Sequence, residues 1–374
     1  MKVIFACAGT GGHINPAIAI ANIILKNEPN SEILFIGTKT GLENELVKNA
    51  GFYIKHIRTG KLIRSFTFKN IKAVTETYKG IGEAKKIIKD FKPDLVIGTG
   101  GYICGPVMLA AKKCKIPYIL HESNAFPGIS VKLLAKKAAS VMIGFSDAKN
   151  RLKRKDNVVY TGTPAKFNRD TINNLDKQIC KKELGLNDIN KKIVFVTGGS
   201  QGAIKFNQTV LDMVANNLND EFFVILVAGT KNYDNIVEKK ELIEKEKNID
   251  LSNHIKIEKF IFDMPKMYKV ADLCVVRSGA MTITELTLAA KPAILIPLPT
   301  AAENHQLYNA KVLSDSHAGI IIEQKDLTEE KLLKKINYML EDKINKIMTD
   351  NASKLVINGV DERIYKCISK VLKK

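Results

Sequence analysis

Residues 2–13, Lys-Val-Ile-Phe-Ala-Cys-Ala-Gly-Thr-Gly-Gly-His, decide the fold of the first half of the chain. Their apolar start, Val3 to Ala8, is typical of a buried strand, and the glycines after it are typical of a tight turn into a helix. Residues 192–202, Lys-Ile-Val-Phe-Val-Thr-Gly-Gly-Ser-Gln-Gly, repeat the pattern. The sequence therefore predicts two halves that each open with a strand, a glycine turn and a helix.

The rest of each half alternates short β-branched runs with amphipathic segments, which predicts parallel sheets covered by helices on both faces. With 374 residues the chain exceeds the size of one hydrophobic core. We expect an α/β fold of two doubly wound, Rossmann-like domains, residues 1–163 and 164–374, with the last helix packing back on the first domain. The expected strands are Lys2–Cys7, Glu32–Ile36, Asp94–Ile97, Pro117–Leu120, Ser140–Ile143, Lys192–Val196, Phe222–Val227, His254–Ile257, Leu273–Val276 and Ala293–Ile296.

The composition restricts the partners and the location. The chain carries 58 Lys and Arg against 39 Asp and Glu, a formal net charge of +19 that favours phosphates, anionic lipid or nucleic acid. No basic run is interleaved with aromatic residues, which argues against nucleic acid. No apolar stretch approaches the roughly 20 residues of a membrane-spanning helix, and the apolar start is too short for a signal peptide. The six scattered cysteines lack metal-ligand spacing and predict reduced thiols in the cytosol.

Both glycine turns are suited to anions, because without Cβ atoms the backbone N–H groups and the positive helix end can approach a phosphate. The alternative is that glycine serves only the backbone angles of the turn. Neither turn fits G-x-G-x-x-G, and neither second strand ends in an acidic residue, since Ile36 leads to Gly37 and Val227 leads to Ala228. An NAD enzyme is therefore disfavoured, and so is a Walker-type ATPase, since neither turn contains Gly-Lys-Ser/Thr.

Several further motifs occur in a fixed order along the chain. They are Gly9-Thr10-Gly11-Gly12-His13, Gly100-Gly101-Tyr102, His121-Glu122-Ser123-Asn124, Gly198-Gly199-Ser200-Gln201-Gly202-Ala203, Arg277-Ser278-Gly279-Ala280, and Gln306 with Asn309-Ala310. In this combination the chain resembles the MurG family, within glycosyltransferase family 28, from residue 3 to about residue 320. The resemblance implies a GT-B fold, in which two Rossmann-like domains face a cleft, with the donor on the C-terminal domain and the acceptor on the N-terminal one.

By this resemblance the chain is an inverting enzyme that transfers N-acetylglucosamine from UDP-GlcNAc to the C4 hydroxyl of the muramoyl-pentapeptide of lipid I, forming lipid II in peptidoglycan synthesis. No cofactor and no metal ion are expected, since no Asp-x-Asp cluster is present. The expected location is the cytoplasmic face of the cell membrane, as a peripheral protein. An anionic membrane surface and wall-synthesis proteins are the expected macromolecular partners.

The resemblance also implies a binding set for UDP-GlcNAc. Glu285 is expected on the ribose, because a carboxylate accepts two hydrogen bonds from a vicinal diol; the alternative is a carboxylate that opposes the helix dipole. Gln306 and Asn124 are expected on the sugar, with a surface glutamine and a loop-capping asparagine as alternatives. The backbone at Ile261 is expected near uracil. The full set is Thr10, Gly11, Gly12, Asn124, Lys166, Ser200, Ile261, Ala280, Met281, Thr282, Ile283, Thr284, Glu285 and Gln306.

Catalysis of a direct displacement needs a base and a stabilised leaving group. His13 is the first candidate base, because a neutral imidazole accepts a hydroxyl proton near pH 7; the alternative is a structural histidine that caps the turn. Glu122 is the second candidate. Helix N-termini, Ser200 and Lys166 are expected to stabilise the leaving UDP. Lys166 stands where the family commonly has arginine, so it keeps the charge and loses the bidentate fork.

A basic and apolar segment in the first half is the expected membrane contact. The alternative is a solvated basic loop whose phenylalanines pack inward. The segment comprises Arg58, Lys61, Leu62, Ile63, Arg64, Phe66, Phe68, Lys69 and Lys72.

Three other functions stay open on the sequence. A diacylglycerol glycosyltransferase of the same fold also carries sugar from UDP to a membrane acceptor. A sugar-nucleotide 2-epimerase of the same fold needs no lipid. A nucleotide-sugar-binding module without turnover belongs to a different class, since binding motifs can be present without catalysis.

Overall fold

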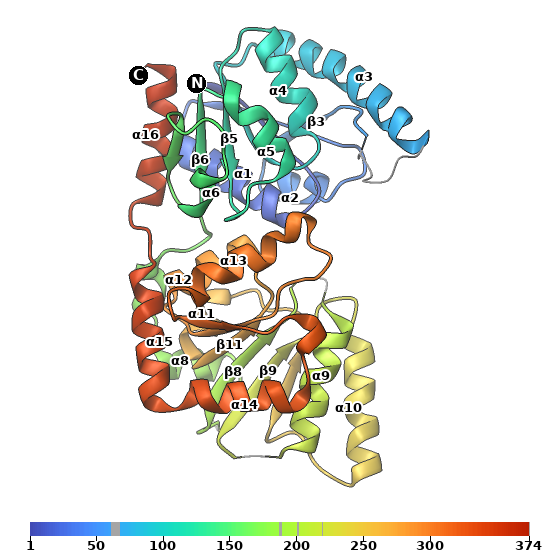
Figure 1. The fold of residues 1–374 in the computed structure, drawn as a ribbon, viewed down its shortest axis with the longest axis vertical. Coiled ribbons are helices and arrows are strands. Elements are labelled where there is room, and N and C mark those ends of the chain that lie inside the picture. Colours follow the sequence, from blue (N-terminus) through green and yellow to red (C-terminus); the bar gives the residue numbers. More distant parts are fainter. Residues whose placement is uncertain (61–67, 187–188, 200–201, 219, 374) are drawn as a thin grey trace. The chain divides into compact units, whose positions relative to one another are not determined.

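The computed structural model describes residues 1–60, 68–186, 189–199, 202–218 and 220–373. It divides into two compact units (Figure 1): Met1–Lys166 together with Ile357–Lys374, and Phe167–Val356. The chain therefore leaves the first unit after Lys166 and returns to it for the last helix. The expected α/β fold with two Rossmann-like domains of the GT-B type is confirmed.

The first unit contains a seven-stranded parallel sheet with strand order β3-β2-β1-β4-β5-β6-β7. Its strands are β1 Lys2–Cys7, β2 Glu32–Gly37, β3 Tyr53–His56, β4 Leu95–Gly100, β5 Tyr118–Glu122, β6 Ser140–Ile143 and β7 Val158–Tyr160. Its helices are α1 Gly11–Asn27, α2 Glu43–Asn49, α3 Phe68–Phe91, α4 Cys104–Lys113, α5 Ile129–Leu134, η1 Ala135–Lys137, α6 Asp147–Asn150 and α16 Val360–Leu372.

The second unit contains a six-stranded parallel sheet with strand order β10-β9-β8-β11-β12-β13. Its strands are β8 Lys192–Thr197, β9 Phe222–Val227, β10 Ile255–Glu258, β11 Leu273–Val276, β12 Ala293–Leu295 and β13 Gly319–Ile321. Its helices are α7 Arg169–Asn173, α8 Lys177–Glu183, α9 Ile204–Asn216, α10 Tyr233–Lys247, α11 Met264–Val270, α12 Ala280–Leu288, η2 Ala302–Asn304, α13 His305–Ser314, η3 Gln324–Asp326, α14 Glu329–Leu340 and α15 Asp342–Lys354.

Alternate residues of the central strands fill two cores, one on each face of the sheet. In β1, Ile4 packs into the core on one face of the sheet, while Val3 and Phe5 pack into the core on the other. Helix α16 belongs to the second of these cores through Ile364 and Ile368, so the end of the chain covers the sheet beside α1. Because both faces are buried, the strands are apolar throughout, as the sequence pattern predicted.

Strands β3, β7 and β13 were not expected from the sequence. All three are edge strands of three or four residues. Their residues are largely half-buried or exposed, so they lack the continuous apolar run that identifies a central strand.

The topology places a switch point in each sheet. From β1 the chain turns to β2 and β3 on one side and then crosses to β4 on the other. The pair β8 and β11 has the same relation in the second sheet. Ligands of doubly wound sheets bind outside the carboxyl ends of the strands at this position, and both glycine turns lie there. Across the described residues, no helix is both long and apolar enough to cross a bilayer.

Backbone segments come into direct contact at the carboxyl ends of neighbouring strands, β1 and β4 in the first unit and β8 and β9 in the second, and glycine makes this possible. Gly101 has φ of +85°, and a Cβ there would overlap the carbonyl of Ala8. Gly202 has φ of +74°, and a Cβ there would overlap the carbonyl of Ala228. Glycine therefore serves both the left-handed backbone and the close approach at these positions.

Replacing Gly202 by alanine should destabilise the fold more than replacing Gly199, although both have positive φ. At Gly199, with φ of +91°, no heavy atom of the described residues lies within 4 Å of an added Cβ, so only backbone strain of about 1 kcal/mol is expected. At Gly202 the clash with Ala228 adds to that strain. Chemical denaturation of the two variants measures the difference, and equal losses would contradict the close approach.

Candidate active site

His13, in the first turn of α1, is held in one orientation. Its Nδ1 lies 3.2 Å from the carbonyl oxygen of Ala8. Because a carbonyl only accepts, Nδ1 carries the proton in this contact, and the lone pair of the neutral ring is on Nε2. The hydroxyl of Thr99 donates to the carbonyl oxygen of His13 at 2.7 Å. The loop thus selects the tautomer that allows Nε2 to accept a proton.

The loop after β4 packs against this histidine. A Cβ added at Gly100 would come within 2.9 Å of Nε2 and still closer to Cδ2 of His13. Gly100 also has φ of +125°. Gly100 therefore lies directly against His13, which places the Gly100 motif beside the first glycine turn.

The start of α1 can bind an anion. The helix begins at Gly11, and the first N–H groups of a helix have no intrahelical partner. No acidic residue lies in its first turn. Thr10 and Gly12 are exposed and Gly11 is half-buried. These three expected residues therefore present a positive helix end beside His13.

Glu122, at the carboxyl end of β5, uses both oxygens to shape the loop after it. Its Oε1 accepts hydrogen bonds from the backbone N–H and the side-chain amide of Asn124, both at 2.9 Å. Its Oε2 accepts the N–H of Gly128 at 2.8 Å. Glu122 is buried and Asn124 is half-buried. The carboxylate therefore holds the asparagine side chain in place, with the asparagine nearer the surface.

His121, the residue before it, is wholly buried. Its Nε2 lies 3.4 Å from the carbonyl oxygen of Gly162, and its Nδ1 lies 3.4 Å from the hydroxyl of Ser123. Burial lowers the pKa of His121 to about 4, although the carbonyl of Gly162 opposes the shift. The ring is therefore neutral at physiological pH, and it packs in the interior beneath the end of β5.

The glycine turn of the second unit is only partly described. Ser200 was expected on the nucleotide phosphates and lies outside the described residues. Gly199 donates its N–H to the hydroxyl of Thr197 at 3.2 Å, and Gly202 donates to the carbonyl of Gly199 at 2.8 Å. These bonds define a compact turn at the carboxyl end of β8.

The second anion-binding feature of this unit is the start of α12. The helix begins at Ala280 after Gly279, with no acidic residue in its first turn and no side-chain cap. Met281 and Thr282 are half-buried. The side chain of Ile283 is fully buried, and its N–H donates to Gly279, so this expected residue faces the core. The helix end therefore offers backbone N–H groups rather than charged side chains.

Glu285 lies one turn further along α12. The hydroxyl of Tyr268 donates to its Oε2 at 3.0 Å. Burial and then the charge of Glu285 raise the pKa of Tyr268 well above its usual value, so the tyrosine keeps its proton and remains a donor. Thr284 instead donates to the carbonyl of Ala280 at 3.0 Å. Glu285 is thereby fixed while it stays half-buried.

The end of β11 is joined to the loop that carries Gln306. Ser278 donates its hydroxyl to the carbonyl of Gln306 at 2.8 Å, and the Gln306 Oε1 accepts the N–H of Leu298 at 2.9 Å. Arg277 is nearly buried and donates to the carbonyls of Ile296 and Pro297, at 3.1 and 3.2 Å. Hydrogen bonds from Arg277 and Ser278 therefore link the end of β11 to the segment that carries Gln306.

Two remaining expected residues lie at the surface. Ile261 follows β10 and is half-buried, next to Phe260, whose ring meets that of Phe262 at 4.9 Å in an edge-to-face contact. Phe262 is 93% exposed. Lys166 is exposed at the end of the first unit.

Known proteins resemble the chain over its whole length. The glycosyltransferase family 28 N-terminal domain matches residues 3–143, and the corresponding C-terminal domain matches residues 193–363. A curated protein of Acetivibrio thermocellus, "UDP-N-acetylglucosamine--N-acetylmuramyl-(pentapeptide) pyrophosphoryl-undecaprenol N-acetylglucosamine transferase", is 42% identical, with 100% of this chain and 99% of that protein covered. The crystal structure of Acinetobacter baumannii MurG has a TM-score of 0.78 at 27% identity, covering 99% of both chains.

The chain belongs to the MurG family of glycosyltransferases. A more distant structure, the S. aureus MnaA-UDP co-structure, shares the fold with a TM-score of 0.69 at 16% identity, covering 100% of this chain and 97% of that one. The resemblance inferred from the motifs is thus confirmed by full-length similarity. Within the MurG family fold, the first unit holds His13, Glu122 and Asn124 at carboxyl strand ends, and the second holds Glu285 and Gln306.

One residue near the first glycine turn was missed by the sequence reasoning. Glu43 begins α2 and is completely buried. Its Oε1 accepts the N–H and the hydroxyl of Thr38, at 2.9 and 2.6 Å, and its Oε2 accepts the N–H of Gly9 at 3.3 Å. The sequence feature that points to Glu43 is the pair Gly37 and Gly41, because the absence of their Cβ atoms leaves space for its side chain.

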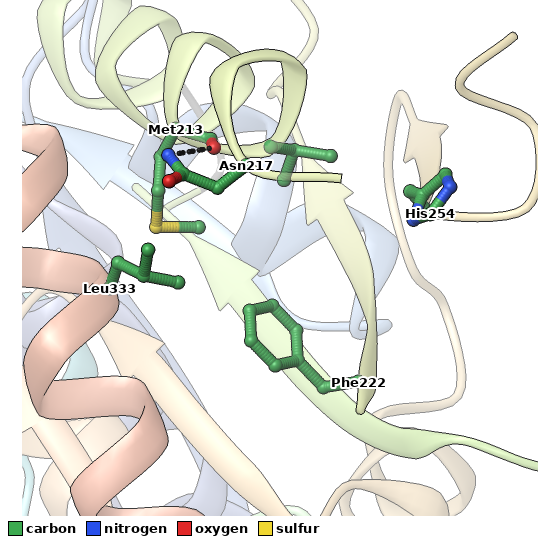
Figure 2. Close-up of a pocket in the computed structure, with 6 residues that line it drawn as sticks. Met213, Asn217, Phe222, His254 and Leu333 are labelled. Atoms are coloured by element: carbon green, nitrogen blue, oxygen red, sulfur yellow. Dashed lines mark hydrogen bonds between the residues drawn. The ribbon is translucent and has the colours of Figure 1, made fainter. Parts of the chain in front are cut away.

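A shallow hollow in the second unit lies away from these residues. Figure 2 shows Met213, Asn217, Phe222, His254 and Leu333 around it. Its empty volume is about 200 Å³, including open solvent. Phe222 begins β9 and His254 precedes β10, so the hollow lies at the amino ends of the strands. That edge is opposite to the candidate site.

Acid should destabilise the fold through His121. Its folded pKa of about 4 lies below the ordinary value of 6.5, so only the unfolded state takes up a proton as the pH falls from 6.5 to 4. This difference of about 2.5 units costs roughly 3 kcal/mol by pH 4 and nothing above pH 7. The free energy of unfolding of His121→Phe should depend less on pH in this window. The exposed His317, replaced in the same way, is the control; identical pH profiles for both variants would contradict the assignment.

Proposed function

We propose that the chain transfers N-acetylglucosamine from UDP-GlcNAc to the C4 hydroxyl of the muramoyl-pentapeptide of lipid I, forming lipid II with inversion at the anomeric carbon. The carrying observation is the full-length, 42% identity to a protein named for the transfer of N-acetylglucosamine from UDP-N-acetylglucosamine to N-acetylmuramyl-(pentapeptide) pyrophosphoryl-undecaprenol. The geometry adds support, since each unit has an anion-binding helix end and fixed polar side chains at its switch point.

In the first unit, His13 is the general base. Its Nδ1–H is held by the carbonyl of Ala8, so Nε2 accepts the proton of the acceptor hydroxyl as that oxygen attacks the anomeric carbon. The resemblance implied Gly11 and Gly12 for UDP-GlcNAc; because they lie beside His13 in the acceptor unit, we assign their N–H groups to the pyrophosphate of the acceptor instead. This arrangement positions base and acceptor from one turn of the chain.

Glu122 has a different role from the base considered on sequence grounds. Its two oxygens already accept N–H groups from Asn124 and Gly128. Protonating it would weaken all of these bonds. Glu122 therefore orients the Asn124 amide for a sugar hydroxyl, and His13 carries the proton.

In the second unit, the start of α12 binds the diphosphate of UDP and stabilises its charge as it leaves. Glu285, held by Tyr268, accepts hydrogen bonds from the ribose hydroxyls. The Gln306 amide oxygen is occupied by Leu298, so its NH₂ group faces the sugar. Ser200, outside the described residues, and Lys166, in the first unit, remain expected on the phosphates by the resemblance alone.

The enzyme acts as a peripheral protein on the cytoplasmic face of the membrane, where a polyprenyl acceptor resides. Support comes from α4 and α5, where Leu109, Ile129 and Leu133 are exposed, Leu133 by 76%. Two lysines accompany them: Lys137 approaches Lys112 closely enough to lower the pKa of Lys112. Exposed leucines with paired ammonium groups suit an anionic lipid surface.

The membrane contact expected between Arg58 and Lys72 is only partly described by the structure. Residues 61–67 lie outside the described residues, and so do the side chains from Phe68 to Lys72. Arg58 is described, and its guanidinium is engaged by Glu83 at 2.7 Å.

Transfer of labelled N-acetylglucosamine from UDP-GlcNAc to a short-chain lipid I analogue tests the proposed function. Label is expected on lipid I and none on diacylglycerol, with a no-acceptor reaction in parallel. Label on diacylglycerol would favour the lipid glycosyltransferase instead. No label on either acceptor would favour a 2-epimerase or a binding module.

His13→Ala should lower kcat for lipid I by roughly 10²- to 10⁴-fold, the usual contribution of a general base. The KM for UDP-GlcNAc should change little, because the histidine belongs to the acceptor side. His317→Ala is the matched control, since His317 is exposed and precedes β13 at the amino edge of the second sheet. A kcat within threefold of wild type for His13→Ala, about 0.6 kcal/mol, would rule out this role.

A further inference from the structure

Glu43 lies in a space that the fold leaves for a carboxylate. The side chain is fully buried at the start of α2. A Cβ at Gly41 would overlap the carboxylate itself, and a Cβ at Gly37 would come within 2.7 Å of its Cγ. The segment from Gly37 to Gly41 therefore folds around this one side chain. Such a buried acid is costly unless its oxygens are hydrogen-bonded.

Hydrogen bonds satisfy the buried carboxylate. Thr38 donates its N–H and its hydroxyl to one oxygen, and Gly9 donates its N–H to the other. Burial alone would raise the pKa of Glu43, but these hydrogen bonds outweigh it and hold the pKa below its usual value. The group is therefore ionised at neutral pH.

The bond to Gly9 connects Glu43 with the candidate base. The N–H of Gly9 and the carbonyl of Ala8 belong to the same planar peptide unit. Glu43 accepts from the N–H end of that unit at 3.3 Å, and His13 Nδ1 donates to its carbonyl end at 3.2 Å. One peptide group thus lies between a carboxylate and an imidazole, with a hydrogen bond on each side.

We propose that Glu43 is a positioning residue for His13, acting through the Ala8–Gly9 peptide. The carboxylate fixes the plane of that peptide and polarises it, because hydrogen bonds in a chain strengthen one another. The carbonyl then holds the Nδ1–H more firmly and stabilises the positive ring that forms when Nε2 takes a proton. No proton moves along the chain of bonds. The inference rests on the proposed function, in which His13 is the base.

Other titratable groups near the site do not replace Glu43. Burial raises the pKa of Cys7, at the end of β1, and raises that of Cys104, on α4, to about 12, so both thiols stay neutral. The single S–H of Cys104 faces the carbonyl oxygens of Ala6 and Gly100, which lie 3.3 and 3.1 Å from its sulfur. Glu122, at the end of β5, is directed to its own loop. The carboxylate that contacts the Ala8–Gly9 peptide is that of Glu43.

The charge of Glu43 argues for positioning rather than for ligand binding. A negative group beside the start of α1 repels the acceptor pyrophosphate instead of attracting it. Its benefit must therefore come from the orientation and polarisation of the peptide. A purely structural role would stabilise the loop without affecting how His13 titrates.

The test is the pH dependence of kcat/KM for the lipid I analogue in Glu43→Gln. The neutral amide keeps the size of the side chain and removes its charge. We expect the acid limb, which reports protonation of the base, to move to lower pH by roughly half to one unit. We expect kcat to fall three- to tenfold while the KM for UDP-GlcNAc stays unchanged. Glu45→Gln is the matched control, because Glu45 is exposed in the same turn of α2.

A second measurement is independent of turnover. Nitrogen-15 NMR of histidine-labelled wild-type protein should show the Nδ1–H tautomer for His13, assigned by its loss in His13→Ala, and its protonation midpoint should fall in Glu43→Gln. Glu43→Asp keeps the charge and should retain more of the wild-type midpoint, which covers a glutamine variant that folds poorly. An unchanged midpoint and acid limb in folded Glu43→Gln would overturn the proposal. Failure of the proposed function would instead appear in the wild-type protein, as absence of label on lipid I.

Discussion

Main-chain segments touch at the carboxyl ends of neighbouring strands in each unit, and the arrangement of the first glycine turn depends on that contact. In the first unit Gly101 approaches the carbonyl of Ala8, and in the second Gly202 approaches that of Ala228. Between β1 and β4 the connections to the next strands leave toward opposite sides of the sheet, so the backbone groups at this edge lie beyond the hydrogen-bond ladder. They must be satisfied by side chains or by ligands. The carbonyl of Ala8 is satisfied by His13, so the hydrogen bond that the turn requires also fixes the orientation of the proposed base.

The protonation state of each buried group follows from what faces it. His121 faces a carbonyl and a hydroxyl in a fully buried position, and burial keeps it neutral. Glu43 is equally inaccessible, but N–H and O–H donors surround it, and it stays ionised. Tyr268 keeps its proton because burial raises its pKa, and because ionising it would place a second negative charge beside that of Glu285. At one pH the fold therefore keeps His121 neutral, Glu43 ionised and Tyr268 protonated as a hydrogen-bond donor.

The sequence predicted what is local and repetitive. Long apolar strands and glycine turns identified both sheets, whereas the short edge strand Tyr53–His56 gave no apolar run. The resemblance supplied the site residues as a run, which included Ile283 although the helical period turns its side chain into the core. Glu43 was missed because its partner Gly9 is 34 residues away. The hydrogen bonds that Glu122 accepts from Asn124 were also hidden, since they depend on the path of the loop.

A peptide between the carboxylate of Glu43 and the ring of His13 resolves a conflict of charges. A carboxylate in direct contact with the proposed base would orient it strongly, but would also put a negative charge beside the helix end proposed to bind the acceptor's pyrophosphate. Coulomb repulsion falls with distance. The peptide is planar and resists twisting, so a hydrogen bond that orients the Gly9 N–H also orients the Ala8 carbonyl. The first glycine turn can therefore orient a base with a buried acid and still bind an anion. This explains why the carboxylate lies behind Gly9, within the fold, rather than at the surface beside His13.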